Sequence, residues 1–205
     1  NFIKNIKQIQ KREKPSGLIV QLPLPRPLWT SAVLNAIDPK IDVDCLTDFN
    51  QGKLLMKQPY VEPPTPAAVM AILKELKIKP AGKNITILGA GVLVGKPLAV
   101  MLANAGATVV ACNKKTKNIK QKCLQAEIII TAVGKYKLLT ADMVKKNAVV
   151  IDAGIVFKNH QMSGDVDFKN VKKKAGYITP VPGGVGPITV ASLLYNTLLC
   201  AKKQP

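Results

Sequence analysis

Three glycines stand in a short segment whose spacing suits phosphate binding. Residues 89–95 read GAGVLVG and lie between an apolar stretch typical of a strand and a pattern typical of a helix. Glycines at such a turn let the backbone bend tightly toward a pyrophosphate, whose charge is met by free N–H groups at the helix start. The spacing is GxGxxxG rather than GxGxxG, so the surrounding strand and helix carry much of the prediction. We predict that Gly89, Ala90, Gly91 and Gly95 bind a dinucleotide; the alternative is a tight turn without a ligand.

The residues that follow the next strand bear on the choice of cofactor. An NAD enzyme usually places an acidic side chain about 20 residues beyond the glycines, where it accepts from a ribose hydroxyl. Here residues 111–116 read ACNKKT, and no acid occurs between Gly91 and Glu127. Lysines such as Lys114 suit a 2′-phosphate, so we expect NADP. The alternative is that these lysines only form a solvated loop.

A glutamine ends the apolar run Gly17-Leu18-Ile19-Val20 in the segment GLIVQLPLP. The prolines at 23 and 25 deny the strand further ladder donors and leave its carboxyl tip open, where α/β proteins build their sites. Gln21 has donors and an acceptor but never changes charge at ordinary pH. We therefore expect Gln21 to lie at the edge where such folds build their sites.

The charge of the chain points to a polyanion, but its composition argues against nucleic acid. The formal net charge is +18, yet only Arg12 and Arg26 among the 30 basic residues are arginines, and aromatic residues make up 4%. Base and phosphate recognition favours the arginine fork, and single strands favour aromatic stacking. We expect the dispersed lysines to form a solvated face.

Cysteine and histidine usage excludes several kinds of site. The four cysteines are far apart, which indicates neither a zinc site nor a disulfide framework, and His160 is the single histidine, in a polar turn where we expect it to be exposed. A histidine-based triad and a metal site are not expected. Because no apolar run approaches the roughly 20 residues of a membrane span, and no signal peptide is seen, a cytoplasmic enzyme without a membrane partner is the default.

Apolar runs and helical patterns alternate over most of the chain. Strands are expected at 84–88, 108–112, 127–132, 148–152 and 177–179, helices at 94–104 and 141–146, and a hairpin within 156–167. Such alternation predicts a parallel, doubly wound α/β sheet. A last helix is expected from 188 to 202, with its buried side formed by Ile188, Ala191, Leu194, Tyr195, Leu198 and Leu199.

The first part of the chain resembles the end of a βαβ unit. Phe2, Ile3, Ile6 and Ile9 predict an amphipathic helix, followed by a doubly buried strand at 17–22 and a short helix at 31–37. A helix from Thr65 as N-cap and Pro66 as first residue to about Lys77 follows. No strand precedes the first helix and residue 1 is asparagine, so we expect this chain to be the C-terminal part of a longer one.

Eight segments together closely resemble the bifunctional methylenetetrahydrofolate dehydrogenase/methenyltetrahydrofolate cyclohydrolase family. They read VQLPLP, AIDPKIDVD, PPTPAAVM, GKNITILGAGVLVGKPL, AVG, VVIDAGI, GDVDF and YITPVPGGVGPITVASLL, and the match runs from about Gly17 to Lys203. The resemblance implies oxidation of 5,10-methylenetetrahydrofolate with NADP and hydrolysis of the methenyl product to 10-formyltetrahydrofolate. It also implies a homodimer and an α/β fold: a partial folate-binding catalytic domain at 1–63, a Rossmann-type NADP-binding domain at 64–186, and a helix at 187–205 that packs back onto the catalytic domain.

The resemblance also assigns roles to residues of this chain. Gln21 matches the glutamine beside the catalytic lysine, and Asp44 matches the aspartate that binds the pterin. The glycine segment and Ile155 match cofactor contacts, and the loop containing Pro182, Gly183 and Gly184 matches a wall near the folate and the nicotinamide. The chain departs from the family pattern at three places: Cys45 replaces a glycine, Gly91 a serine, and Asn113-Lys114 a His-Ser pair.

The family's YxxxK motif, which carries the catalytic lysine, has no counterpart in the sequence, because the positions four after Tyr60 and Tyr136 are Pro64 and Thr140. Hydrolysis needs a group that can handle a proton, which a lysine of depressed pKa provides and a glutamine does not. We therefore expect the 205 residues alone to be inactive. Two alternatives are a natural short form that binds NADP or folate without catalysis, and a basic Rossmann module of unrelated function.

Overall fold

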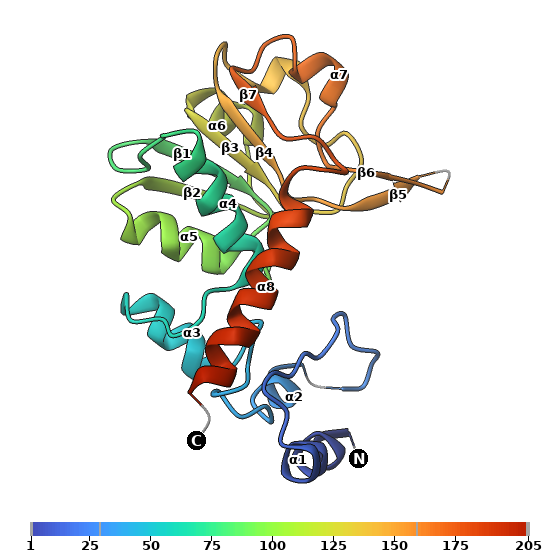
Figure 1. The fold of residues 1–205 in the computed structure, drawn as a ribbon. Coiled ribbons are helices and arrows are strands. Elements are labelled where there is room, and N and C mark those ends of the chain that lie inside the picture. Colours follow the sequence, from blue (N-terminus) through green and yellow to red (C-terminus); the bar gives the residue numbers. More distant parts are fainter. Residues whose placement is uncertain (1, 29, 159, 204–205) are drawn as a thin grey trace. The chain divides into compact units, whose positions relative to one another are not determined.

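The computed structural model describes residues 2–28, 30–158 and 160–203. The chain divides into two compact units (Figure 1). The larger unit is continuous, from residue 65 to residue 189, and the smaller combines residues 1–64 with residues 190–205. Each unit has its own apolar core.

The larger unit is built on a five-stranded parallel sheet with the order β2-β1-β3-β4-β7. The strands are β1 (Asn84–Leu88), β2 (Thr108–Cys112), β3 (Ile128–Thr131), β4 (Val149–Asp152) and β7 (Tyr177–Ile178). In β3, Ile128 and Ile130 belong to one buried cluster and Ile129 to another, because successive side chains of a strand point to opposite faces. The predicted α/β class and parallel sheet are confirmed.

Helices cover both faces of this sheet. Residues of α4 (Pro64–Glu75) and α5 (Gly95–Asn104) share a cluster with Ile85 and Ile87, while residues of α6 (Ile119–Gln125) and α7 (Phe168–Val171) belong to the cluster of the opposite face. The lysine-rich segment after β2, for which the sequence predicts no element, contains α6. Cys123 is the buried residue of this short helix, and its side chain packs in the core.

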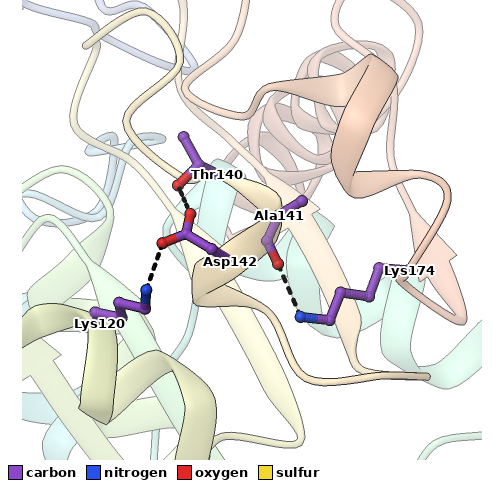
Figure 2. Close-up of polar contacts among 5 residues, drawn as sticks. All are labelled: Lys120, Thr140, Ala141, Asp142 and Lys174. Carbon is purple, nitrogen blue, oxygen red and sulfur yellow. Dashed lines mark hydrogen bonds and ion pairs between the residues drawn. The ribbon is translucent and has the colours of Figure 1, made fainter.

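The helix expected at 141–146 is wrong in type and length, because only a 3₁₀ turn, η1 (Ala141–Met143), forms there. The Ala141 carbonyl accepts from Val144 N–H at 3.3 Å and from Lys174 Nζ at 3.0 Å, so it is not part of an α-helical ladder. Figure 2 shows the contact of Lys174 with the Ala141 carbonyl, and also Asp142, which accepts from Lys120 Nζ at 2.6 Å. The Lys120 ammonium and the Thr140 hydroxyl lower the pKa of Asp142 to about 2.

The expected hairpin forms from β5 (Val156–Lys158) and β6 (Gln161–Ser163), which pair in antiparallel fashion. It is shorter than the segment predicted to contain it. His160 lies at its turn with φ of 60° and is exposed, as predicted.

The smaller unit contains α1 (Phe2–Glu13), α2 (Thr30–Leu34), α3 (Asp48–Leu55) and most of α8 (Val185–Lys202). The amphipathic α1 is confirmed, with Ile6 buried in the same cluster as Val20 and Val33. A second cluster joins Val43, Val61 and two cysteines to α8.

The strand predicted at 17–22 is wrong. The segment makes a single parallel bridge, Leu18 with Asp42, with Leu18 N donating to Ile41 O at 2.8 Å. It is not doubly buried either, since Ile19 is 44% exposed. A strand needs a neighbour that offers a row of donors and acceptors, and an apolar run reports burial tendency but not that neighbour.

Two helix predictions also need correction. The helix α4 begins at Pro64, so Thr65 and Pro66 lie inside its first turn rather than at its cap. On α8 the predicted buried side is wrong at Leu194 and Tyr195, which are 66% and 61% exposed, as well as at Ala191 and Leu198.

The orientation of α8 within the smaller unit is explained by a polar residue. Asn196 is buried, and its Nδ2 donates to Val43 O at 2.8 Å and to Glu62 O at 2.7 Å. Buried carbonyls need a donor, so this amide sets which side of the helix faces the core. The spacing of apolar residues along the helix does not predict this hydrogen-bonding amide.

Candidate cofactor and folate sites

The turn that follows β1 can be formed only by glycines at two of its positions. Gly89 has φ of +107°, and a Cβ there would lie 2.3 Å from Ala132 O. A Cβ at Gly95 would lie 1.7 Å from Gly89 O. No side chain can be accommodated at such distances, so the backbone packs directly against itself at both positions. We call this turn of Gly89 and Gly95 the glycine cradle.

The outer side of this turn is open. Nothing lies within 4 Å of a Cβ placed on Gly91. The first residues of α5 receive no side-chain cap from Val94, and Gly91 O accepts from Lys96 N at 2.9 Å. Because Lys96 N and Leu98 N already have partners and Pro97 has no N–H, it is the exposed glycine backbone of the turn itself that fits the pyrophosphate of a dinucleotide.

The remaining cofactor candidates lie beyond the carboxyl ends of the neighbouring parallel strands. Ala132 to Gly134 follow β3, and Ile155, which is exposed, follows β4. A Cβ on Gly134 would be 3.4 Å from Ile155 O, so these two loops touch. The structure therefore brings the glycine turn, this loop and Ile155 to one edge of the sheet, which is where doubly wound folds bind their ligands.

The loop of the predicted folate wall begins beyond β7. Pro182 is exposed, and Gly183 has φ of +96°, which favours glycine. A Cβ on Gly184 would lie 2.4 Å from Pro180 O, so this glycine permits a close turn of the backbone before α8.

Lys114 lies in a compact turn after β2. The Asn113 side chain accepts from Lys115 N at 2.9 Å, and Asn113 N donates to Thr116 Oγ1 at 2.9 Å. Both lysines are exposed. An exposed ammonium on a fixed turn can pair with a phosphate, so the residues present fit the 2′-phosphate of NADP.

In the smaller unit, two acidic residues of the DVD segment have different environments. Asp42 is fully buried and accepts from Leu46 N at 3.0 Å, Thr47 N at 2.8 Å, Thr47 Oγ1 at 2.7 Å and Asn50 Nδ2 at 2.9 Å. Asp44 is half-buried, and no hydrogen bond from the described residues contributes to the pKa of its carboxyl group. Burial, and then the charge of Asp42, raise the pKa of Asp44 to about 6. A carboxylate that is only half-buried is able to accept from a ligand.

The residue after Asp44, Cys45, is one of the departures from the family pattern. Cys45 is buried with φ of 56°, in the left-handed region that favours glycine. Its carbonyl accepts from Gln51 Nε2 at 2.5 Å, which supports this conformation. The chain thus places a cysteine side chain in the core at a backbone position suited to glycine.

Gln21 is exposed, and its Nε2 donates to Leu22 O at 3.2 Å. Gln21 and Asp44 both follow the parallel bridge of Leu18 with Asp42 in the same chain direction. The bridge places the two segments side by side and parallel at Leu18 and Asp42.

Sequence reasoning missed several buried polar residues that hold these loops. Asp152 at the end of β4 accepts through Oδ1 from Thr131 Oγ1 at 2.8 Å and Gly154 N at 3.0 Å, and through Oδ2 from Val166 N at 2.9 Å. Asp165 is also fully buried. The available signal was an aspartate that ends an apolar strand in VVID, and a second aspartate within GDVD. Among the described residues, no group of three or more His, Cys, Asp or Glu side chains could hold a metal ion.

A parallel sheet with a glycine turn at its carboxyl edge defines a dinucleotide-binding protein of the Rossmann class. Comparison with known proteins agrees, because the family model described as Tetrahydrofolate dehydrogenase/cyclohydrolase, NAD(P)-binding domain, matches residues 63–205. The chain belongs to the tetrahydrofolate dehydrogenase/cyclohydrolase family, as its sequence motifs predicted.

Relatives with high identity extend this result to nearly the whole chain. It is 46% identical over 202 residues to the Bifunctional protein FolD of Methanosphaerula palustris, covering 98% of this chain and 72% of that protein. It is 51% identical over 189 residues to the Bifunctional protein FolD of Campylobacter concisus, covering 92% of this chain and 67% of that protein. The similarity thus includes the folate segments as well as the matched NAD(P)-binding domain.

Solved structures give the same answer. The bifunctional enzyme FolD from Campylobacter jejuni matches with a TM-score of 0.92 and 43% identity, covering 98% of this chain and 72% of that one. The FolD of Trypanosoma brucei, complexed with NADP cofactor and inhibitor, matches with a TM-score of 0.92 and 36% identity over the same shares. Together with the glycine cradle, these findings support NADP as the cofactor and folate-related substrates. No helix in the described part of the chain is long and apolar enough to cross a membrane.

Proposed function

We propose that this protein oxidises 5,10-methylenetetrahydrofolate to 5,10-methenyltetrahydrofolate with NADP and hydrolyses the product to 10-formyltetrahydrofolate. The observation that carries the proposal is the glycine cradle of Gly89 and Gly95, in a chain whose relatives are bifunctional FolD proteins. We assign residues 1–63 to the folate-binding domain, residues 64–186 to the NADP-binding domain, and residues 187–205, which include most of α8, to the folate side.

The chain's own residues hold the cofactor at the edge of the sheet. The turn offers the backbone of Ala90 and Gly91 to the pyrophosphate, and Lys114 meets the 2′-phosphate. Ile155 covers part of the site with exposed apolar surface. NADP held there would supply the hydride acceptor for oxidation of the methylene carbon of the folate.

Polar groups of the smaller unit bind the pterin of the folate. Asp44, when ionised, accepts from the amide and amino N–H groups of the pterin through its half-buried carboxylate. Gln21 is an orienting group of the same unit. In the larger unit, Pro182, Gly183 and Gly184 form a backbone wall without bulky side chains. Gln21 does not titrate at ordinary pH, so the hydrolysis needs a further ionisable group.

Measurements of binding and turnover test this function. Calorimetric titration of the 205 residues should give saturable binding of NADP and of a tetrahydrofolate without turnover, whereas a chain that also contains a YxxxK segment should reduce NADP when 5,10-methylenetetrahydrofolate is added. Binding of both ligands without turnover in that longer chain would favour a non-catalytic NADP- and folate-binding form. Failure to bind either ligand would contradict the proposal.

The preference for NADP over NAD should depend on Lys114. Replacing it with glutamine removes a charge-assisted contact to the 2′-phosphate and should lower NADP affinity about 10-fold, leaving NAD affinity unchanged. The matched control is Lys117→Gln, which removes the same charge from another exposed lysine nearby. Equal losses in the two variants, measured by fluorescence titration with both dinucleotides, would exclude a specific role for Lys114.

We further propose a cytoplasmic homodimer that binds neither nucleic acid nor membrane. The four cysteines are free and buried, as is usual in a reducing compartment. Exposed apolar side chains, such as Phe157 and Met162 of the hairpin, provide surface for association. Light scattering that found one chain per particle would contradict the homodimer.

A further inference from the structure

A single buried carboxylate gathers the backbone of the loop that follows β3. Asp165 Oδ2 accepts from Val133 N at 2.7 Å, and Oδ1 accepts from Lys135 N at 2.6 Å. The amide of Gly134, between them, also donates to this carboxylate. Three successive N–H groups that converge on one anion form a rigid arrangement, like the backbone nests that bind anionic ligands.

The surroundings of Asp165 leave it no room to move. The residue is fully buried, and a Cβ on Gly154 would lie only 2.2 Å from its carboxyl carbon. Its own amide donates to Asp152 Oδ1 at 3.1 Å, and its carbonyl accepts from Leu139 N at 3.0 Å. Asp165 is therefore fixed to the end of β4 on one side and to the loop after β3 on the other.

The loop that Asp165 holds is the wall of the glycine turn. The tightest approach to Gly89 is by Ala132 O, 2.3 Å from the position of a Cβ. Ala132 directly precedes the three gathered amides, so a shift of this loop moves the carbonyl against which the turn packs. On its other side, Gly134 lies against Ile155 O.

We propose that Asp165 is a positioning residue for NADP: its carboxylate holds the Val133–Lys135 loop so that the glycine turn and Ile155 keep the shape that receives the cofactor. The inference rests on the proposed role of the Gly89–Gly95 turn. Asp165 does not touch the ligand; it acts through three backbone amides.

Electrostatics explain why the ionised carboxylate is required. Burial raises the pKa of Asp165, the backbone amides of Val133 and Lys135 lower it, and the charge of Asp152 raises it, with a net upward direction. Asp152 is the charged group that faces it from β4. A protonated Asp165 would place a donor among three N–H groups and would lose at least one of these bonds.

The test replaces Asp165 with asparagine, which keeps the shape but turns an NH₂ group toward the loop amides. NADP affinity should fall about 10-fold or more, because one buried N–H is left unpaired and the loop shifts. The matched control is Asp142→Asn, which removes the same charge at an exposed site of the same unit and should change affinity less than about twofold. An Asp165→Asn protein with unchanged NADP affinity overturns the proposal.

A measurement on the unmodified protein covers the case in which this variant does not fold. The amide resonances of Val133, Gly134 and Lys135 should move together as the pH is lowered through the raised pKa of Asp165, and should respond to added NADP. Amides that respond to neither overturn the proposal.

A third variant separates this inference from the proposed function. Gly91→Asp places a carboxylate where a Cβ meets nothing within 4 Å, so the fold persists while the pyrophosphate is repelled. Unchanged NADP affinity in Gly91→Asp refutes the role of the glycine turn itself. Loss of affinity in Gly91→Asp, with none in Asp165→Asn, refutes the positioning role alone.

Discussion

Replacing Gly95 with alanine should abolish measurable NADP binding. The new methyl carbon would stand 1.7 Å from Gly89 O, so α5 and the glycine turn must move apart. A displacement of about 1 Å in a binding frame costs on the order of 100-fold. Forcing an extra methyl group into a closed turn should also lower the free energy of unfolding by about 1–3 kcal/mol.

Calorimetric titration with NADP and thermal unfolding together measure both effects. The control is Gly52→Ala in α3, where a Cβ meets nothing within 4 Å and NADP binding should be unaffected. Alanine in a helix is favoured over glycine, so this control should be as stable as the parent or more stable. A Gly95→Ala protein that binds NADP with parental affinity would disprove the cradle.

Replacing Asp44 with asparagine should weaken folate binding while making the protein more stable. Asparagine loses the charge-assisted bonds to the pterin, worth about 1.5–3 kcal/mol, or about 10- to 100-fold in affinity. NADP affinity should stay constant, because the contacts proposed for NADP all lie in the larger unit. Titration of both ligands into the parent and the variant measures this difference.

The gain in stability follows from the raised pKa of Asp44. Its folded-state pKa of about 6 lies above the ordinary 3.8, so the folded protein binds the proton more tightly than the unfolded chain does. Asp44 therefore adds no penalty below 3.8, destabilises the fold increasingly as the pH rises to about 6, and exerts its full penalty above that. Allowing for its partial exposure, the penalty is about 1–2 kcal/mol.

Denaturant unfolding of Asp44→Asn across this pH range checks the sign. The variant should be more stable than the parent above about pH 6 and equal to it below the ordinary aspartate pKa. The control Glu13→Gln removes an exposed charge in the same unit and should leave the pH dependence as it is. A stability difference that is independent of pH would rule out this origin.

The sequence predicts the larger unit well because its signals are local. Runs such as the isoleucines of β3 and the apolar part of β4 can be little else than buried strands, and the glycine turn has a recognisable context. The site candidates that belong to named motifs could be found in the same way. For each of these residues, the required backbone or side-chain property is visible within a few positions.

What the sequence does not predict depends on partners far along the chain. Asn196 sets the buried side of α8 through carbonyls more than a hundred residues away, and Asp165 acts on amides about thirty residues earlier. The segment at 17–22 has the apolar pattern of a strand but only one bridging partner in the described part of the chain. The periodicity of apolar residues predicts neither hydrogen bonds to distant residues nor the presence of a neighbouring strand.

The close approach of Ala132 O to Gly89 determines when the glycine turn can form during folding, as well as its shape. The two residues are separated by α5, β2, α6 and β3, and the restraint on the loop after Ala132 comes from still later in the chain, at Asp165. Closing such long loops costs entropy that only the completed sheet repays. During synthesis, a chain that has emerged only as far as the glycine turn is therefore still a flexible peptide. The turn takes its final shape together with the sheet.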